Sequence, residues 1–136
     1  MEGVVIAAEQ GQNDVLRVFL EEGVDPNFVD SPFPTPLWIA AREGHLHTVK
    51  MLLDYGVAID CVHRRHGSAL MAAAIKGDQN IVRLLLDNGA NIDLVNHRNG
   101  ETAVSMAACF SQKVVLEYLI QRGANATIQD VLGTTA

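Results

Sequence analysis

The sequence predicts an all-α protein made of stacked helix-turn-helix repeats with hairpin fingers between them. Alanine pairs recur every 33 residues, and every 34 at the last step, at Ala7-Ala8, Ala40-Ala41, Ala73-Ala74 and Ala107-Ala108. Glycines follow the same grid at Gly23, Gly56, Gly89 and Gly123. Self-similarity at a fixed period of roughly 20–50 residues is typical of solenoids, in which each repeat packs only on its neighbours.

Composition and charge narrow the range of functions. Of the 136 residues, 49% are hydrophobic and 19% are charged, so the chain can bury a core. The net charge of −6 disfavours a general binder of nucleic acid or of anionic membranes, because both need a basic surface. No apolar run approaches about 20 residues, so no membrane span is expected. Cys61 and Cys109 fall at different points of the repeat, and two unpaired thiols indicate the cytoplasm or the nucleus.

The first helix of a repeat is clearest after Thr35. The Thr35 hydroxyl can cap a helix, and Pro36 suits the first helical position because its missing N–H would be unpaired there. Leu37, Ala40 and Ala41 then form one apolar stripe at helical spacing, and the small alanines allow a neighbouring helix to come close. Gly44 is expected to end this helix.

A second amphipathic helix and a finger complete the repeat. The pattern places apolar residues inward and Lys50 and Asp54 outward, with Val49, Met51, Leu52 and Leu53 as the inward set. Gly56 stands where a left-handed C-terminal cap is needed. The stretch 57–66 has no helical period, so it is expected to form an extended finger that leads to the next repeat.

These residues resemble the ankyrin-repeat signature. The segment from Thr35 to His45 reads TPLWIAAREGH, against the family pattern T-P-L-H-x-A-A-x-x-G-H, with Trp38 in place of the usual histidine. The match continues into residues 87–93, DNGANID, and the same grid covers essentially the whole chain. The resemblance implies two antiparallel helices and a β-hairpin finger per repeat, stacked into a curved ankyrin-repeat solenoid.

The grid divides one domain, residues 1–136, into four repeats at approximately 1–33, 34–66, 67–99 and 100–132, with the start of a fifth at 133–136. The fourth repeat replaces its turn glycine with Ser111, and one extra residue near 99–101 lengthens the finger that enters it. The first repeat has a polar second helix and is expected to be an N-terminal cap. The opening of a fifth repeat predicts a longer parent protein or a partner that covers this end.

The resemblance implies that partners contact the finger tips and the exposed side of each first helix. The tips of the second and third fingers carry Arg64, Arg65, His97 and Arg98, a basic cluster on an otherwise acidic chain. Arginine offers a planar fork to a carboxylate or a phosphate, so an acidic or phosphorylated protein segment is the expected ligand. A solvated finger tip without a partner is the alternative at this point.

Four further candidates lie on the first helices. Arg42 belongs to the exposed side, while Ile75 and Phe110 are apolar where polar residues are expected. We expect both to lie beside the basic tips, where an apolar anchor next to arginine can form a hot spot. Packing of Phe110 on a finger or on a fifth repeat is the alternative. For Trp38, filling of the core is favoured over contact with a partner.

No chemistry beyond binding is indicated. The run from Cys61 to His66, with His97 one finger away, contains metal ligands, but two arginines stand between its histidines and oppose a cation. Neither cysteine has a histidine in clear reach for nucleophilic catalysis. A glycine-rich phosphate loop and a dinucleotide fingerprint are both absent from the sequence. We therefore expect no metal, no cofactor and no enzyme activity.

The predicted function is a monomeric, non-catalytic scaffold that presents a concave surface with basic finger tips to a protein or peptide. A regulatory or substrate-targeting ankyrin segment of a larger enzyme is the alternative, and sequence beyond Ala136 would separate the two. Nucleic-acid binding through the basic tips is a weaker third interpretation, which strongly salt-dependent binding to a random duplex would support.

Overall fold

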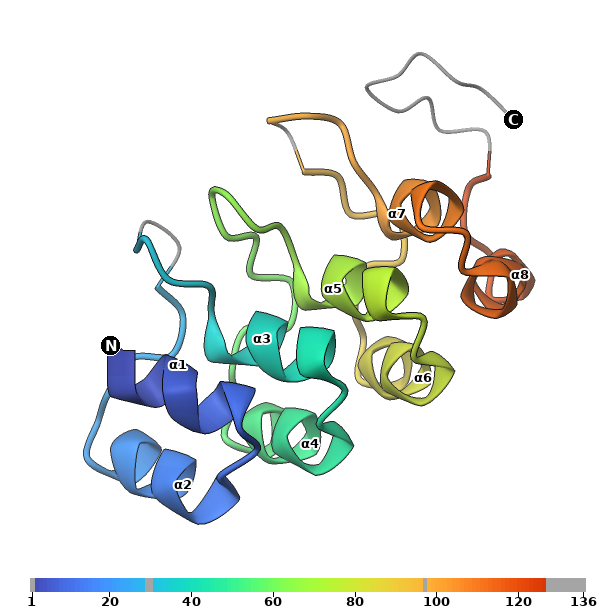
Figure 1. Cartoon of the computed structure of the whole chain (residues 1–136). Coiled ribbons are helices and arrows are strands. Elements are labelled where there is room, and N and C mark those ends of the chain that lie inside the picture. Colours follow the sequence, from blue (N-terminus) through green and yellow to red (C-terminus); the bar gives the residue numbers. More distant parts are fainter. Residues whose placement is uncertain (1, 29–30, 97, 127–136) are drawn as a thin grey trace.

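Four pairs of antiparallel helices stand in single file in a computed structural model that describes residues 2–28, 31–96 and 98–126 (Figure 1). The helices of these described residues are α1 (Glu2–Glu9), α2 (Asn13–Glu21), α3 (Pro36–Glu43), α4 (Leu46–Asp54), α5 (Ala69–Lys76), α6 (Gln79–Asp87), α7 (Ala103–Cys109) and α8 (Lys113–Gln121). This arrangement confirms the predicted all-α solenoid. The start of the fifth repeat lies outside the described residues.

The caps that the sequence predicts are present. The Thr35 hydroxyl oxygen accepts a hydrogen bond from the backbone N–H of Trp38 at 3.2 Å, and Pro36 occupies the first turn of α3. Ser68 and Thr102 cap α5 and α7 in the same way. Gly44 ends α3 with a φ of +81°, in the left-handed region that glycine enters without a Cβ penalty.

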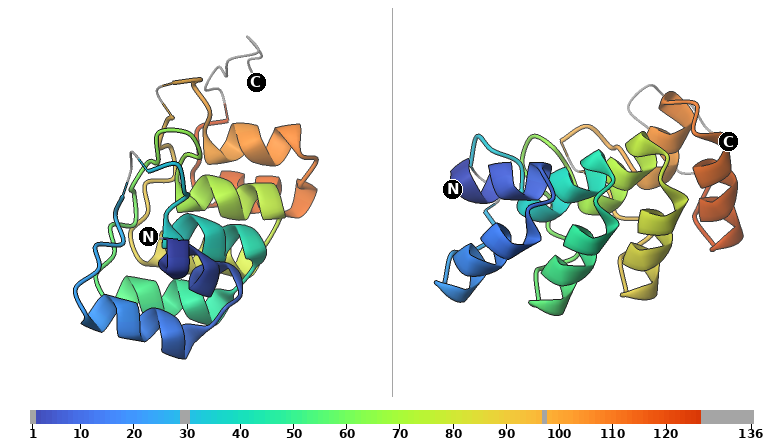
Figure 2. Two further views of the ribbon diagram at one scale, coloured as in Figure 1. Left: turned by 60° about the vertical axis from the view of Figure 1, so that its left-hand side comes forward. Right: turned by 60° about the horizontal axis from the view of Figure 1, so that its bottom comes forward.

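The core runs along the stack between an inner and an outer row of helices. α1, α3, α5 and α7 form the inner row and pack more closely on one another than α2, α4, α6 and α8 of the outer row. Figure 2 shows both rows from the side. Leu52, Leu85 and Leu119 hold the same position in successive repeats and are fully buried. Leu53 and Leu86 are partly buried against this core, as the inward pattern predicts.

Among the described residues, two fingers are hairpin turns that are each closed by one antiparallel bridge. His63 pairs with Gly67 in the second finger, and Asn96 pairs with Glu101 in the third. The bridge of the third finger encloses one residue more than the bridge of the second finger, which confirms the predicted insertion near 99–101. The arginine tips therefore sit inside these two turns.

Polar side chains tie consecutive fingers together. The Asp60 Oδ1 atom accepts the backbone N–H of Asn91 at 3.0 Å, one repeat further along the chain. The same link recurs from Asn27 to Ala58 at 3.1 Å and from Asp93 to Asn125 at 2.8 Å. This position braces the stack rather than a single hairpin, because the acceptor and the donor belong to different repeats.

The first repeat departs from the expected polar cap. The charged residues of α2 are exposed as predicted, but so are the apolar side chains of Ile6, Val15 and Val18. The polar residues in the sequence correctly predict that the outer side of α2 is exposed. They do not predict the apolar side chains on the side that faces away from the second repeat.

Candidate partner-binding surface

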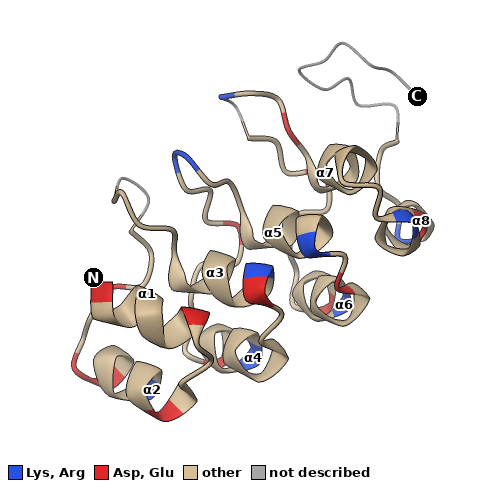
Figure 3. Cartoon of the chain, viewed as in Figure 1, with Lys and Arg blue, Asp and Glu red and all other residues tan. Residues whose placement is uncertain are grey.

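Basic residues lie at the tips of two consecutive fingers (Figure 3). Arg64 and Arg65 are exposed within the turn that the His63–Gly67 bridge closes. Arg98 is exposed within the next turn, which Asn96 and Glu101 close. His97 lies outside the described residues. None of these three arginines forms an ion pair with another described residue, so their charges are available to a ligand.

A small polar hollow separates the first finger from the second. Ser31 and Pro32 line one side and Arg64 and Arg65 the other, around a volume of about 130 Å³. A hollow with two unpaired guanidinium groups on one wall can accept an anionic group, since arginine forms paired hydrogen bonds to carboxylate and phosphate oxygens. Because its two walls belong to different repeats, this hollow forms only when the two repeats pack in their native register.

The His63 ring fixes the conformation of the second finger. Its side chain is fully buried, and its Nε2 atom lies 2.7 Å from the carbonyl oxygen of Ser31. Its Nδ1 atom accepts the backbone N–H groups of Arg65 at 3.1 Å and His66 at 3.3 Å. Because Nδ1 is the acceptor, Nε2 carries the proton that is donated to Ser31. His63 thus positions the two arginines and joins their finger to the preceding one.

A row of rings supports this finger from below. The ring centroids of Trp38 and His66 are 5.0 Å apart, and those of His66 and His63 are 4.7 Å apart. Burial is the main cause of a lowered pKa for His66, and electrostatic interactions with His63 and with the charged Arg65 lower this pKa further, against an opposing contribution from the Pro32 backbone. Positive charge at the finger tip near neutral pH therefore comes from the arginines rather than from His66.

Comparison with known protein families agrees with this geometry. The family described as ankyrin repeats (3 copies) matches residues 4–96 and, in an overlapping second match, residues 60–130. This chain is an ankyrin-repeat protein. Ankyrin repeats are generally protein–protein interaction modules, and proteins built from them are typically non-catalytic. A search of curated protein sequences found no match. Among the described residues, no helix is both long and apolar enough to cross a membrane.

Three of the predicted contact residues of this ankyrin-repeat protein lie away from the finger tips. Arg42 and Ile75 occupy the last turns of α3 and α5, and Phe110 directly follows α7. A helix of eight residues is about 12 Å long, so these side chains are at the opposite ends of the first helices from the fingers. Our expectation that Ile75 and Phe110 lie beside the arginines is therefore wrong. Ile75 is partly buried, and Phe110 is 52% exposed.

Trp38 packs as the favoured interpretation predicts. Its side chain is partly buried against the core and contacts the His66 ring at an interplanar angle of 47°. Its Nε1 atom is buried and has no hydrogen-bond partner among the described residues. The backbone of Trp38, rather than its side chain, bonds to the capping Thr35. Trp38 therefore supports the finger without reaching its tip.

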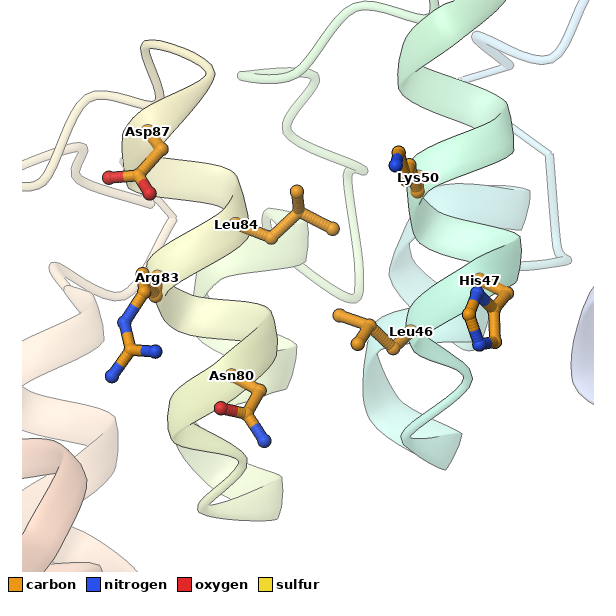
Figure 4. Close-up of a pocket in the computed structure, with 7 residues that line it drawn as sticks. All are labelled: Leu46, His47, Lys50, Asn80, Arg83, Leu84 and Asp87. Atoms are coloured by element: carbon orange, nitrogen blue, oxygen red, sulfur yellow. The ribbon is translucent and has the colours of Figure 1, made fainter.

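A second hollow of this ankyrin-repeat protein lies on the outer helices and was not found from the sequence. It has a volume of about 360 Å³ between α4 and α6, and its lining residues are Leu46, His47, Lys50, Asn80, Arg83, Leu84 and Asp87. In Figure 4 the Leu46 and Leu84 side chains point toward each other, whereas Arg83 and Asp87 point away from α4. Asp87 pairs with Arg122, which directly follows α8, at 3.1 Å. The hollow is thus mainly an apolar gap between outer helices, and it lies apart from the basic fingers.

The two cysteines differ in exposure. Cys61 and Cys109 are free thiols, the first partly buried and the second exposed. Burial, followed by the negative charge of Asp25, raises the pKa of the Cys61 thiol and so lowers its nucleophilicity near neutral pH. Within the described ranges, no cluster of three or more histidine, cysteine or acidic side chains could hold a metal ion.

Proposed function

We propose that this chain is a non-catalytic scaffold whose finger tips bind an acidic or phosphorylated segment of a partner protein. The observation that carries the proposal is the polar hollow of about 130 Å³ between consecutive fingers, with Arg64 and Arg65 on its wall. Arg98, exposed on the next finger, extends the basic surface along the stack. An extended segment that crosses the fingers can meet all three arginines.

The physical basis is a positive surface on a rigid frame. His63 and the links between fingers hold the turns in place, so little ordering is required when a ligand binds. The chain as a whole is acidic, with a net charge of −6, so an anionic ligand is attracted at the basic fingers and repelled elsewhere. Two free thiols support placement of the protein in the cytoplasm or nucleus.

The test is a charge reversal with a matched control. Fluorescence anisotropy compares an acidic peptide, a phosphoserine peptide and a basic peptide as probes. The finger variant carries Arg64→Glu, Arg65→Glu and Arg98→Glu. The control variant carries Arg17→Glu, Lys50→Glu and Lys113→Glu, three exposed positions on outer helices that change the net charge by the same amount.

We expect the wild type and the control to bind the acidic or phosphorylated probe, and the finger variant to lose at least about tenfold in affinity. The melting temperatures should stay together, because the replaced side chains are exposed. Equal affinity of the finger variant and the wild type would refute the proposal. If the finger variant loses affinity as expected, affinity purification with mass spectrometry on the same three proteins identifies the partners that depend on the fingers.

A further inference from the structure

A tyrosine ring lies at two of the boundaries between successive outer helices. At the boundary of α2 and α4, the Tyr55 hydroxyl donates a hydrogen bond to the Glu21 carboxylate of α2 at 3.0 Å. At the boundary of α6 and α8, the Arg83 guanidinium of α6 lies over the Tyr118 ring, 5.7 Å from its centroid. Each tyrosine therefore reaches back across its boundary to the preceding outer helix.

The boundary between α4 and α6 has no tyrosine at either of these positions. Leu84 stands at the repeat position of Tyr118, and Asn88 stands at that of Tyr55. The Asn88 side chain donates a hydrogen bond to the carbonyl oxygen of Leu84 at 2.7 Å, so it turns back on α6. The hollow of about 360 Å³ lies at this boundary, where shorter side chains replace both rings.

The hollow between α4 and α6 combines apolar walls with a positively charged rim. Leu46 is 37% exposed, Leu84 is partly buried, and the two side chains point toward each other across the gap (Figure 4). Lys50 lies on the rim, is exposed and forms no ion pair with another described residue. Asp87 is already paired with Arg122 at 3.1 Å, so the Lys50 charge is available to a ligand.

We propose that this hollow binds an aromatic side chain of a partner protein, in a segment that carries acidic residues beside the aromatic one. Lys50 holds the same repeat position as Arg83, so it can cover the bound ring as Arg83 covers Tyr118. The ring buries apolar surface against Leu46 and Leu84, and the acidic residues complement the Lys50 charge. Because the hollow lies apart from the basic fingers, one chain can hold a different segment at each site.

Chemical-shift titration of the isotope-labelled full chain tests the proposal, with blocked peptides at up to about 5 mM. The acidic probe has one tryptophan with glutamates on both sides. One comparison peptide has alanine in place of the tryptophan, and the other has lysines in place of the glutamates. We expect the acidic probe to shift the amide signals of α4 and α6 at the hollow, and the alanine peptide to leave them unchanged. The lysine peptide should bind there at least about threefold more weakly, because Lys50 repels it.

Leu84→Tyr copies Tyr118 and places a ring of the chain itself at the hollow, so it should abolish these shifts. Val18→Tyr is the matched control, because Val18 holds the same repeat position on α2, outside the hollow, and is 57% exposed. This control should bind the acidic probe as the wild type does. Thermal melts establish that each variant is folded. Lys50→Glu, at an exposed position, is the second variant and should weaken the acidic probe at least about threefold.

Absence of shifts at α4 and α6 up to about 5 mM probe would overturn the proposal. So would unchanged binding there by folded Leu84→Tyr or, if that variant unfolds, by Lys50→Glu. Equal shifts with the alanine peptide would also contradict it, because charge alone would then suffice. The finger variant with Arg64→Glu, Arg65→Glu and Arg98→Glu should keep the shifts at the hollow, since the fingers do not line it. Failure at one site is therefore distinguishable from failure at the other.

Discussion

The side-chain amide of Gln112 donates a hydrogen bond to the carbonyl oxygen of Ile75 across the boundary between the third and fourth repeats, at 2.7 Å. The imidazole of His45 makes the equivalent contact with Glu9 between the first and second repeats. At the middle boundary this position is Asp78, whose carboxylate caps α6 by accepting the N–H of Ile81. A carboxylate cannot donate, so the middle boundary depends more on packing.

Gln112→Ala should therefore lower the free energy of unfolding by about 0.5–1.5 kcal/mol, the usual net contribution of one hydrogen bond. Urea denaturation monitored by circular dichroism measures this change. Gln12→Ala is the control, because Gln12 has the same position and residue type but no described repeat before it. A cost for Gln12→Ala equal to that for Gln112→Ala would show that the inter-repeat bond is not the cause.

Ser111 is the one described non-glycine residue with a positive φ, +56°, at the turn between α7 and α8. The corresponding positions of the other repeats hold Gly11, Gly44 and Gly77. Ser111→Gly should stabilise the protein by about 0.5–1 kcal/mol, because relief of the left-handed strain exceeds the added freedom of the unfolded chain. Chemical denaturation checks the shift. Ser111→Ala, which retains the strain, should not stabilise the protein.

Asp60→Ala should weaken the link between the second and third fingers and destabilise the protein by about 1 kcal/mol, since it removes the acceptor for the Asn91 N–H. Asp60→Asn should restore most of the loss, because Asn27 makes the same link with an amide oxygen in the first finger. A similar stability of Asp60→Ala and wild type in urea titrations would mean that water replaces this bond without cost.

The pH dependence of stability should report on His66. The folded protein holds the pKa of His66 below its ordinary value of 6.5, so the unfolded chain takes up this proton first as pH falls. The contribution of His66 is fully present above about pH 6.5 and is lost as pH decreases from there toward the folded-state pKa. Compared between about pH 7.5 and about pH 5.5, the urea midpoint should fall more for wild type than for His66→Asn. An equal fall in both proteins would exclude His66 as the titrating group.

The caps and turns could be predicted from the sequence because their causes are local. Thr35, Pro36 and Gly44 act on backbone groups within one helix, and the residue types alone specify that action. The exposure of Arg64 and Arg65 followed from their place in a finger tip. The positions of Ile75 and Phe110 could not be predicted in this way. The repeat pattern indicates which side of a helix a residue occupies, but it does not give the distance between that residue and a neighbouring finger.

His63 shows the same limit at the candidate site. The sequence marks it as one more basic residue beside the arginines, yet it is fully buried and bonded to Ser31, which is 32 residues earlier in the chain. Its equivalent in the next finger is Asn96, which is also buried, so the repeat grid contained a signal for a structural role. A buried polar position that recurs in successive fingers, as at His63 and Asn96, indicates an internal hydrogen bond rather than a ligand contact.

The sequence by itself determined that each described repeat holds two helices, how these helices are capped and at what period they stack. These features depend on residue type and spacing alone. Only the tertiary structure decided which surfaces remain open. Burial of a side chain depends on whether a neighbouring repeat covers it, and Ile6 and Ile39 are the same residue at the same repeat position with opposite exposure. The hollow between the first two fingers, with Arg64 and Arg65 on its wall, is likewise a property of the assembled stack.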